Sequence, residues 1–127
     1  MNPIKSKVTG TSFYDDGIIE LHCKKGTELH LERDPSNEHD ENAIKVMATT
    51  PSGLKQIGHI TKTLAKTLAK EMDNGSDVTA TITKITGGTN SSPNYGVNIQ
   101  VEIDDSVGIT TWLILGGVLY AIYTFIF

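Results

Sequence analysis

The sequence lacks features that would point to a disulfide-stapled protein or a metalloprotein. Its single cysteine, Cys23, excludes an internal disulfide and makes a reducing compartment the simpler interpretation. No CxxC or paired Cys/His spacing suggests zinc, and only the fold could bring the four histidines together at a metal. These histidines are His22, His30, His39 and His59. We therefore expect no metal site and no cofactor.

Catalytic signatures and a basic excess are also missing. There is no Gly-x4-Gly-Lys-Ser/Thr phosphate loop and no nucleophile elbow, and 127 residues leave no room for a helicase motor. Asp34, Asp40 and Glu41 suggest a magnesium-dependent nuclease only remotely, because turn carboxylates are common and no second carboxylate motif accompanies them. With 11 basic and 15 acidic residues, the net charge of −4 disfavours a long track of phosphate contacts. A non-enzymatic protein making a short contact fits better.

The sequence does contain short β-like runs separated by turn residues. The runs cover 6–14, 18–22, 28–33, 43–49, 56–60, 78–85 and 97–103. Together with one clear helix, they predict a mainly β (α+β) domain over residues 1–105, built as a small OB-like or SH3-like, partly closed β-barrel. Such barrels present a concave face to ligands, so we expect the binding site there.

The helix is predicted from about residue 61 or 62 to 72, where Leu64, Leu68 and Met72 form an apolar stripe. Lysines at positions 62, 66 and 70 repeat at the same spacing on another face. This lysine row either lies along a phosphate backbone or is simply a solvated face. Lys62 is the better placed of the three, because it lies at the helix start, where free backbone N–H groups favour an anion.

The stretch from Leu31 to Val46 is unusually polar for a connection between two strands. Asp34-Pro35 ends the first strand, because proline donates no ladder hydrogen bond and restricts the residue before it. Asn37, Asp40 and Asn42 are residue types that bond nearby backbone groups, so we expect a rigid corner. Asp40 and Asn42 then either face a ligand or only cap the turn.

Four motifs occur in order: Gly10-x-x-x-Tyr14, the Arg-Asp-Pro-x-Asn-x-x-Asp-x-Asn-Ala-Ile-x-Val run of 33–46, Ile-Gly-His-Ile at 57–60, and a helix ending Met-Asp-Asn at 72–74. Over roughly residues 8–103 this pattern resembles the HIRAN domain family. The resemblance implies a non-catalytic barrel that holds the 3′ end of single-stranded DNA in a pocket. A carboxylate accepts the terminal hydroxyl there, and aromatic rings stack on the last bases.

Carried over by position, Asp40 resembles the hydroxyl-accepting carboxylate and Asn37 its loop partner. His59 resembles a base or phosphate contact, and Lys62 resembles a phosphate contact. The other predicted contacts are Ser12, Phe13, Tyr14, His39 and Tyr95. Three of these depart from the eukaryotic pattern: Ser12 stands in place of an arginine, and Phe13 and His39 each in place of a tyrosine. Losing the arginine removes a bidentate phosphate or stacking group that serine cannot replace, which predicts weaker affinity. From the sequence pattern alone, Phe13 or Tyr14 could equally be an aromatic residue of the core instead of a ligand contact.

The segment 106–127 contains a 21-residue uncharged stretch from Val107 to Phe127. At about 1.5 Å per residue, a helix of this length crosses a hydrocarbon core of roughly 30 Å, which predicts a C-terminal transmembrane anchor. With no N-terminal signal, the barrel is expected to face the cytoplasm. Its β-branched and aromatic residues alternatively suit buried strands in a larger assembly. Two functions follow: a membrane-tethered binder of single-stranded DNA 3′ ends, or a membrane-anchored protein-interaction barrel that no longer binds DNA.

Overall fold

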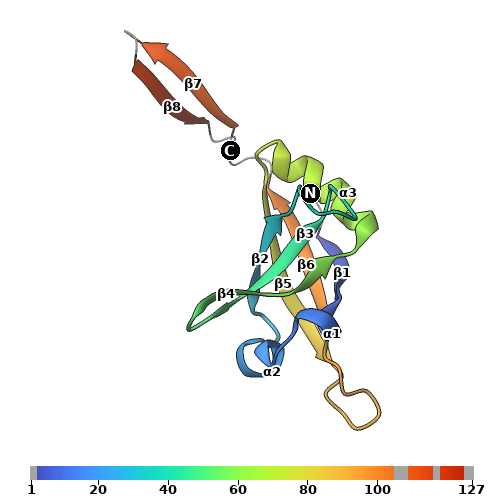
Figure 1. Ribbon diagram of the computed structural model, residues 1–127. Helices are drawn as coiled ribbons and strands as arrows, with labels where there is room; N and C mark the ends of the chain where they lie inside the picture. The colour runs from blue at the N-terminus through green and yellow to red at the C-terminus, as the bar shows by residue number, and fades with distance from the viewer. Residues whose placement is uncertain (1–2, 105–108, 116–117, 125–127) are drawn as a thin grey trace.

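The computed structural model describes residues 3–104 in full and the backbone of 109–115 and 118–124. Residues 3–104 form a closed barrel of antiparallel strands in the order β1-β4-β3-β2-β5-β6 (Figure 1). The strands are β1 (Ile4–Thr9), β2 (Glu28–Arg33), β3 (Ile44–Thr50), β4 (Gly53–Ile60), β5 (Asp77–Thr86) and β6 (Gly96–Asp104). The predicted mainly β barrel is confirmed, but it is closed rather than partly closed.

Closure depends on β1, which divides its short length between two neighbours. Residues 4–7 pair with β6, whereas Val8 and Thr9 pair with Ile60 and His59 of β4. The line along which β1 pairs with β4 is called the seam below. The two strands approach each other so closely there that β4 requires a glycine. A Cβ atom on Gly58 would overlap the carbonyl oxygen of Thr9 and lie 2.6 Å from Cγ1 of Val8. The glycine of the Ile-Gly-His-Ile motif is therefore a closure residue.

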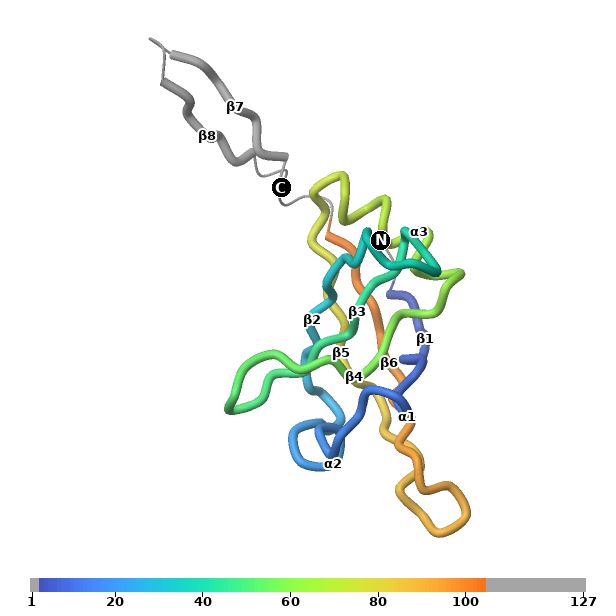
Figure 2. Tube along the Cα trace, in the orientation of Figure 1, coloured from blue at the N-terminus to red at the C-terminus, as the bar shows by residue number. Residues whose placement is uncertain are grey.

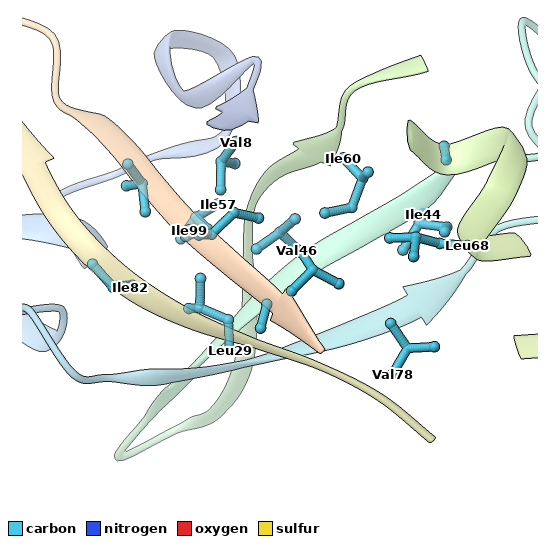
Figure 3. Packing of buried hydrophobic residues seen from close by; sticks show 14 of the residues in the cluster. Val8, Leu29, Ile44, Val46, Ile57, Ile60, Leu68, Val78, Ile82 and Ile99 are labelled. Carbon is cyan, nitrogen blue, oxygen red and sulfur yellow. The ribbon is translucent and has the colours of Figure 1, made fainter. Parts of the chain in front are cut away.

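The barrel interior is filled by aliphatic side chains from every strand (Figure 3). Ile44, Val46 and Ala48 alternate inward along β3, as the two-residue period of a strand requires. Burying aliphatic side chains of this size stabilises a fold by about 1.5–3 kcal/mol each. The alternate residues of the same strands face outward, and part of that outer surface carries the candidate site.

Helix α3 (Lys62–Asp73) matches the predicted helix to within a residue and buries Ala65, Leu68 and Ala69 against the core. Two runs predicted as strands are helical, one of them only at its end. The end of the first run is the single turn α1 (Thr11–Tyr14), and the second is α2 (Ile18–His22). Asp15 Oδ1 accepts the Ile19 N–H at 3.0 Å and so supports the start of α2. A five-residue run such as Ile-Ile-Glu-Leu-His carries too little periodicity to separate a helical turn from a strand.

Helices α1 and α2 follow β1 directly, and the β3–β4 hairpin and the β5–β6 connection extend beyond the barrel (Figure 2). Asn37 and its neighbours connect β2 to β3 near α3. Three separate parts of the chain therefore lie around the end of β4: the α1 turn, the β2–β3 loop and the start of α3. Together they can form one site.

The predicted C-terminal helix is wrong for the residues of that segment that the structure describes. Strands β7 (Ile109–Leu115) and β8 (Val118–Thr124) pair antiparallel, with Leu115 opposite Val118. Many β-branched and aromatic residues favour strands, and two glycines in mid-segment disfavour a helix. Among the residues described, no helix has the length and apolar character to cross a membrane.

Candidate functional site

The β2–β3 loop is held in shape by Asn37, whose side chain makes three hydrogen bonds within the loop. Its Oδ1 accepts the backbone N–H groups of His39 at 2.9 Å and Asp40 at 3.1 Å. Its Nδ2 donates to Asp34 Oδ2 at 3.2 Å. This is the rigid corner predicted from the sequence, and Asn37 acts here as a positioning residue for Asp40.

Asp40 is half-buried and presents a carboxylate with one oxygen unused by the loop. Oδ1 accepts the Asn42 N–H at 2.9 Å, and the Asp40 carbonyl accepts the Ala43 N–H at 3.1 Å. Within residues 3–104, Oδ2 has no hydrogen-bond partner. Asp40 therefore caps the turn and still offers an acceptor to a ligand, so the two interpretations of this residue are compatible.

Arg33 fastens the loop to α3. Its Nη1 donates to the carbonyl oxygens of Glu41 at 3.1 Å and Ala43 at 3.2 Å. Its Nε and Nη2 donate to the two carboxylate oxygens of Asp73 at 3.0 and 3.3 Å. Sequence reasoning quoted Arg33 within a motif but gave it no role. Its position at a strand end, directly before a polar loop, could have predicted this role, because the several N–H donors of a guanidinium suit exposed loop carbonyls.

The ring of His59 lies on the outer side of β4 against Tyr14 of α1. The ring centroids are 5.2 Å apart with an interplanar angle of 70°, an edge-to-face arrangement. Gln56 Nε2 lies 3.4 and 3.5 Å from the two His59 ring nitrogens, and the Thr9 hydroxyl donates to the His59 carbonyl at 3.1 Å. Tyr14 is exposed, so it is not a core aromatic.

These parts surround a cavity of about 320 Å³, called the end cavity below. It is lined by Thr9, Tyr14, Asn37, His39, Asp40, Ala43, His59, Ile60 and Lys62. Six of the nine predicted contacts lie together here: Tyr14, Asn37, His39, Asp40, His59 and Lys62. The end cavity thus combines an acceptor carboxylate, a cation and three ring side chains drawn from segments far apart in sequence.

Ser12, Phe13 and Tyr95 do not line the end cavity. Ser12 and Phe13 lie on α1 beside Tyr14, and Phe13 is 88% exposed, so it is not a core aromatic either. Tyr95 is half-buried against the core, and its ring packs so closely on Gly88 that a Cβ there would lie 2.6 Å from it. Its carbonyl accepts the Thr11 hydroxyl at 2.8 Å, which ties the β5–β6 connection to α1. The structure therefore places the Tyr95 ring under the 87–94 loop.

The start of α3 adds a second polar feature to the end cavity. Thr61 makes no side-chain capping hydrogen bond, so the N–H groups of the first helical turn are not capped by it. Lys62 is exposed at this turn and lines the end cavity, whereas Lys66 and Lys70 do not line it. In residues 3–104, no group of three or more His, Cys, Asp or Glu side chains is arranged to hold a metal ion.

Comparison with known proteins places these features in a family. Human helicase-like transcription factor is 37% identical over 71 residues, which is 56% of this chain but only 6% of that protein. The crystal structure of the HIRAN domain of human HLTF superposes with a TM-score of 0.61 at 27% identity, covering 80% of this chain and 74% of that one. A Lactobacillus plantarum protein shares the fold, with a TM-score of 0.54 at 20% identity, over 80% of this chain and 97% of that one. The sequence model of the HIRAN domain matches residues 2–104. This chain therefore belongs to the HIRAN domain family.

Proposed function

We propose that this protein is a non-catalytic module that binds the 3′-hydroxyl end of single-stranded DNA in the end cavity. The observation that carries the proposal is the free Oδ2 of Asp40, held by a rigid loop within a cavity that also contains Lys62. A carboxylate in a nucleic-acid site needs a reason, because it repels phosphate. A terminal hydroxyl supplies that reason, because it is a donor and carries no charge.

The terminal hydroxyl donates to Asp40 Oδ2 in this arrangement. A hydrogen bond to a charged acceptor contributes about 1.5–3 kcal/mol, which corresponds to roughly ten- to a hundredfold in affinity. A 3′-phosphate brings negative charge to the same carboxylate, and at about 4 Å each charge pair costs up to about 4 kcal/mol at an effective dielectric of about 20. The end cavity therefore selects a free hydroxyl over a phosphorylated end.

The phosphate group linking the last two nucleotides is expected at Lys62 and the first turn of α3. An ammonium group and free helix N–H groups both favour an anion, and neither is occupied by a capping side chain. Only one or two phosphates are neutralised in this way. The salt dependence should then be shallow, with a slope of log K against log salt of about −0.7 to −1.4 for a single strand.

The ring side chains of Tyr14, His39 and His59 contact the bases in this proposal. Stacking on a ring tolerates any base, because every base has a π face, and contributes about 1–3 kcal/mol per base. At about 320 Å³ the end cavity is at the lower end of the range for ligand pockets, which suits a terminal nucleotide rather than a long strand. With His39 exposed and Phe13 outside the cavity, we expect modest affinity.

The proposal is tested by anisotropy titration of fluorescent oligonucleotides that carry either a 3′-hydroxyl or a 3′-phosphate. The wild type should prefer the hydroxyl end by about tenfold or more, and Asp40→Asn should abolish that preference while keeping the Asn42 contact. Glu38→Gln is the matched control, because Glu38 lies in the same loop, is exposed and does not line the end cavity. Equal affinity of the wild type for both ends contradicts the proposal.

The second candidate function is a protein-interaction barrel whose acidic loop meets a basic partner. Its support is that Ser12 and Phe13, which replace an arginine and a tyrosine of the eukaryotic pattern, lie outside the end cavity, while Glu38 and Glu41 are exposed beside it. Failure to bind any oligonucleotide, together with tight binding of a basic protein that Glu38→Gln and Glu41→Gln weaken, would favour this function.

Membrane tethering, with the domain facing the cytoplasm, is a further part of the proposal that rests on the sequence alone. The uncharged stretch 107–127 is its only support. Flotation with liposomes separates the possibilities: the full chain should float and a chain ending at Asp105 should not. A full chain that stays at the bottom of the gradient, or a shortened chain that floats, rules out the tail as the anchor.

A further inference from the structure

A second and larger cavity, called the side cavity below, adjoins the end cavity. Its volume is about 830 Å³, and it lies between the α1–α2 segment and the β3–β4 hairpin. The lining that matters here consists of Tyr14, Ile18, Leu21, Pro51, Lys55 and Gln56. Apart from Tyr14 and Gln56, which contact the His59 ring, none of these residues has a part in the site described above, so the side cavity has no assigned occupant.

The two cavities share a wall. Tyr14 lines both of them, and it contacts the His59 ring on the end-cavity side. Gln56 lines the side cavity, and its Nε2 lies within 3.5 Å of both His59 ring nitrogens. A ligand that leaves the end cavity across the Tyr14 ring therefore meets the side cavity next.

The side cavity offers apolar walls with one cation. Leu21 is 74% exposed, an unusual degree for a large aliphatic side chain, and Ile18 and Pro51 extend the same apolar lining. Lys55 is exposed at the hairpin and provides the positive charge. Asp16 also lines this cavity, so a phosphate belongs on the Lys55 side. Single-strand binders combine aromatic rings on which bases stack with positive charge along the backbone. In the side cavity Tyr14 offers the ring, Lys55 the charge, and Leu21 and Pro51 further apolar surface.

We propose that the strand whose 3′ end lies in the end cavity continues across Tyr14 and places its next nucleotides in the side cavity. This inference rests on the proposed function and extends it. Tyr14 separates the two positions, Leu21 and Pro51 contact bases, and Lys55 contacts a backbone phosphate. The side cavity is more than twice the volume of the end cavity, so it accommodates more than one nucleotide. The binding unit is then three or more nucleotides.

The experiment compares a dinucleotide with a pentanucleotide, both with a free 3′-hydroxyl, on the full chain. Lengthening should tighten binding to the wild type by about tenfold or more, from added stacking and phosphate contact. Lys55→Gln and Leu21→Ser should each weaken pentanucleotide binding by about threefold to tenfold and leave dinucleotide binding unchanged. Both side chains are exposed, so neither substitution threatens folding. Lys84→Gln, an exposed lysine outside both cavities, is the matched control.

A second measurement locates the strand directly. The pentanucleotide should shift the NMR methyl signals of Leu21 and Ile18, whereas the dinucleotide should not. No gain on lengthening, or equal effects of Lys55→Gln on both lengths, overturns the side-cavity proposal even if the hydroxyl preference holds. Pentanucleotide binding that depends on Lys55 but ignores the 3′ end overturns the end-cavity function and leaves the side cavity as a single-strand site that is independent of the 3′ end. Absence of binding at both lengths overturns both.

Discussion

Removing the Arg33 guanidinium should destabilise the loop that presents Asp40. Arg33→Met keeps the apolar stem and removes every hydrogen bond that the guanidinium makes. The bonds from Nη1 to two loop carbonyls are worth about 1.5–3 kcal/mol together, because the donor is charged and the bond to Ala43 is partly buried, whereas the bond to Glu41 is exposed. The ion pair with Asp73 adds only about 0.2–1 kcal/mol, because that carboxylate is 59% exposed. We therefore expect a loss of about 2–4 kcal/mol in the free energy of unfolding.

Urea denaturation of Arg33→Met and Asp73→Ala separates these two contributions. Asp73→Ala removes the ion pair but leaves the carbonyl bonds, so it should cost no more than about 1 kcal/mol. The folded Arg33→Met protein should also lose part of its preference for a 3′-hydroxyl end, because the Asp40 loop is less constrained. If Asp73→Ala costs as much as Arg33→Met, the carbonyl bonds do not hold the loop and the reasoning is refuted.

Three further predictions follow from single contacts. Gly58→Ala should cost about 1–3 kcal/mol or more in thermal or chemical unfolding, because the added methyl group meets the β1 backbone at the barrel seam; a neutral effect would contradict the closure role. Burial, and to a smaller extent the nearby charge of Asp15, raises the pKa of the Cys23 thiol, so alkylation by iodoacetamide should be slow at neutral pH and become faster as the pH rises. Asp15→Asn should accelerate the alkylation, and a wild-type rate equal to that of a free thiol would contradict the raised pKa. Lys62→Gln should weaken oligonucleotide binding by about threefold to tenfold, whereas Lys70→Gln, with the same charge change on α3, should not; equal effects would point to a diffuse lysine face.

The strongly patterned parts of the fold could be predicted from the sequence. The Leu64, Leu68 and Met72 stripe has the helical period, and α3 follows it closely. The runs 28–33 and 43–49 correspond to β2 and β3, because turn residues bound them clearly. The register between β3 and β4 was not predictable, because β4 carries one extra residue, Ile57, where the pairing shifts between Val46 and Met47. Ile57 and Gly58 are both buried there, which interrupts the alternation of β4. Short apolar runs such as 18–22 carry no decisive period, and α2 forms there instead.

The candidate site was predictable only where residue types sit in an ordered motif. Asp40, His59 and Lys62 were found in this way, and the end cavity brings them together. The side cavity was not predictable, because its lining comes from α2 and the β3–β4 hairpin, which have no sequence pattern in common. Long-range contacts such as Arg33 with Asp73, 40 positions apart, likewise have no local signal.

The Ile-Gly-His-Ile motif explains why closure of the barrel and assembly of the site depend on each other. Gly58 lets β1 approach β4, and the same pairing sets Thr9 opposite His59. Tyr14 follows β1 after a single turn, so the seam that closes the barrel also brings this ring against His59. The chain then enters α3 two residues after Ile57-Gly58-His59-Ile60, which places Lys62 at the mouth of the end cavity. A substitution that opens the seam therefore separates Tyr14 from His59 and Lys62, even though it alters none of these three residues.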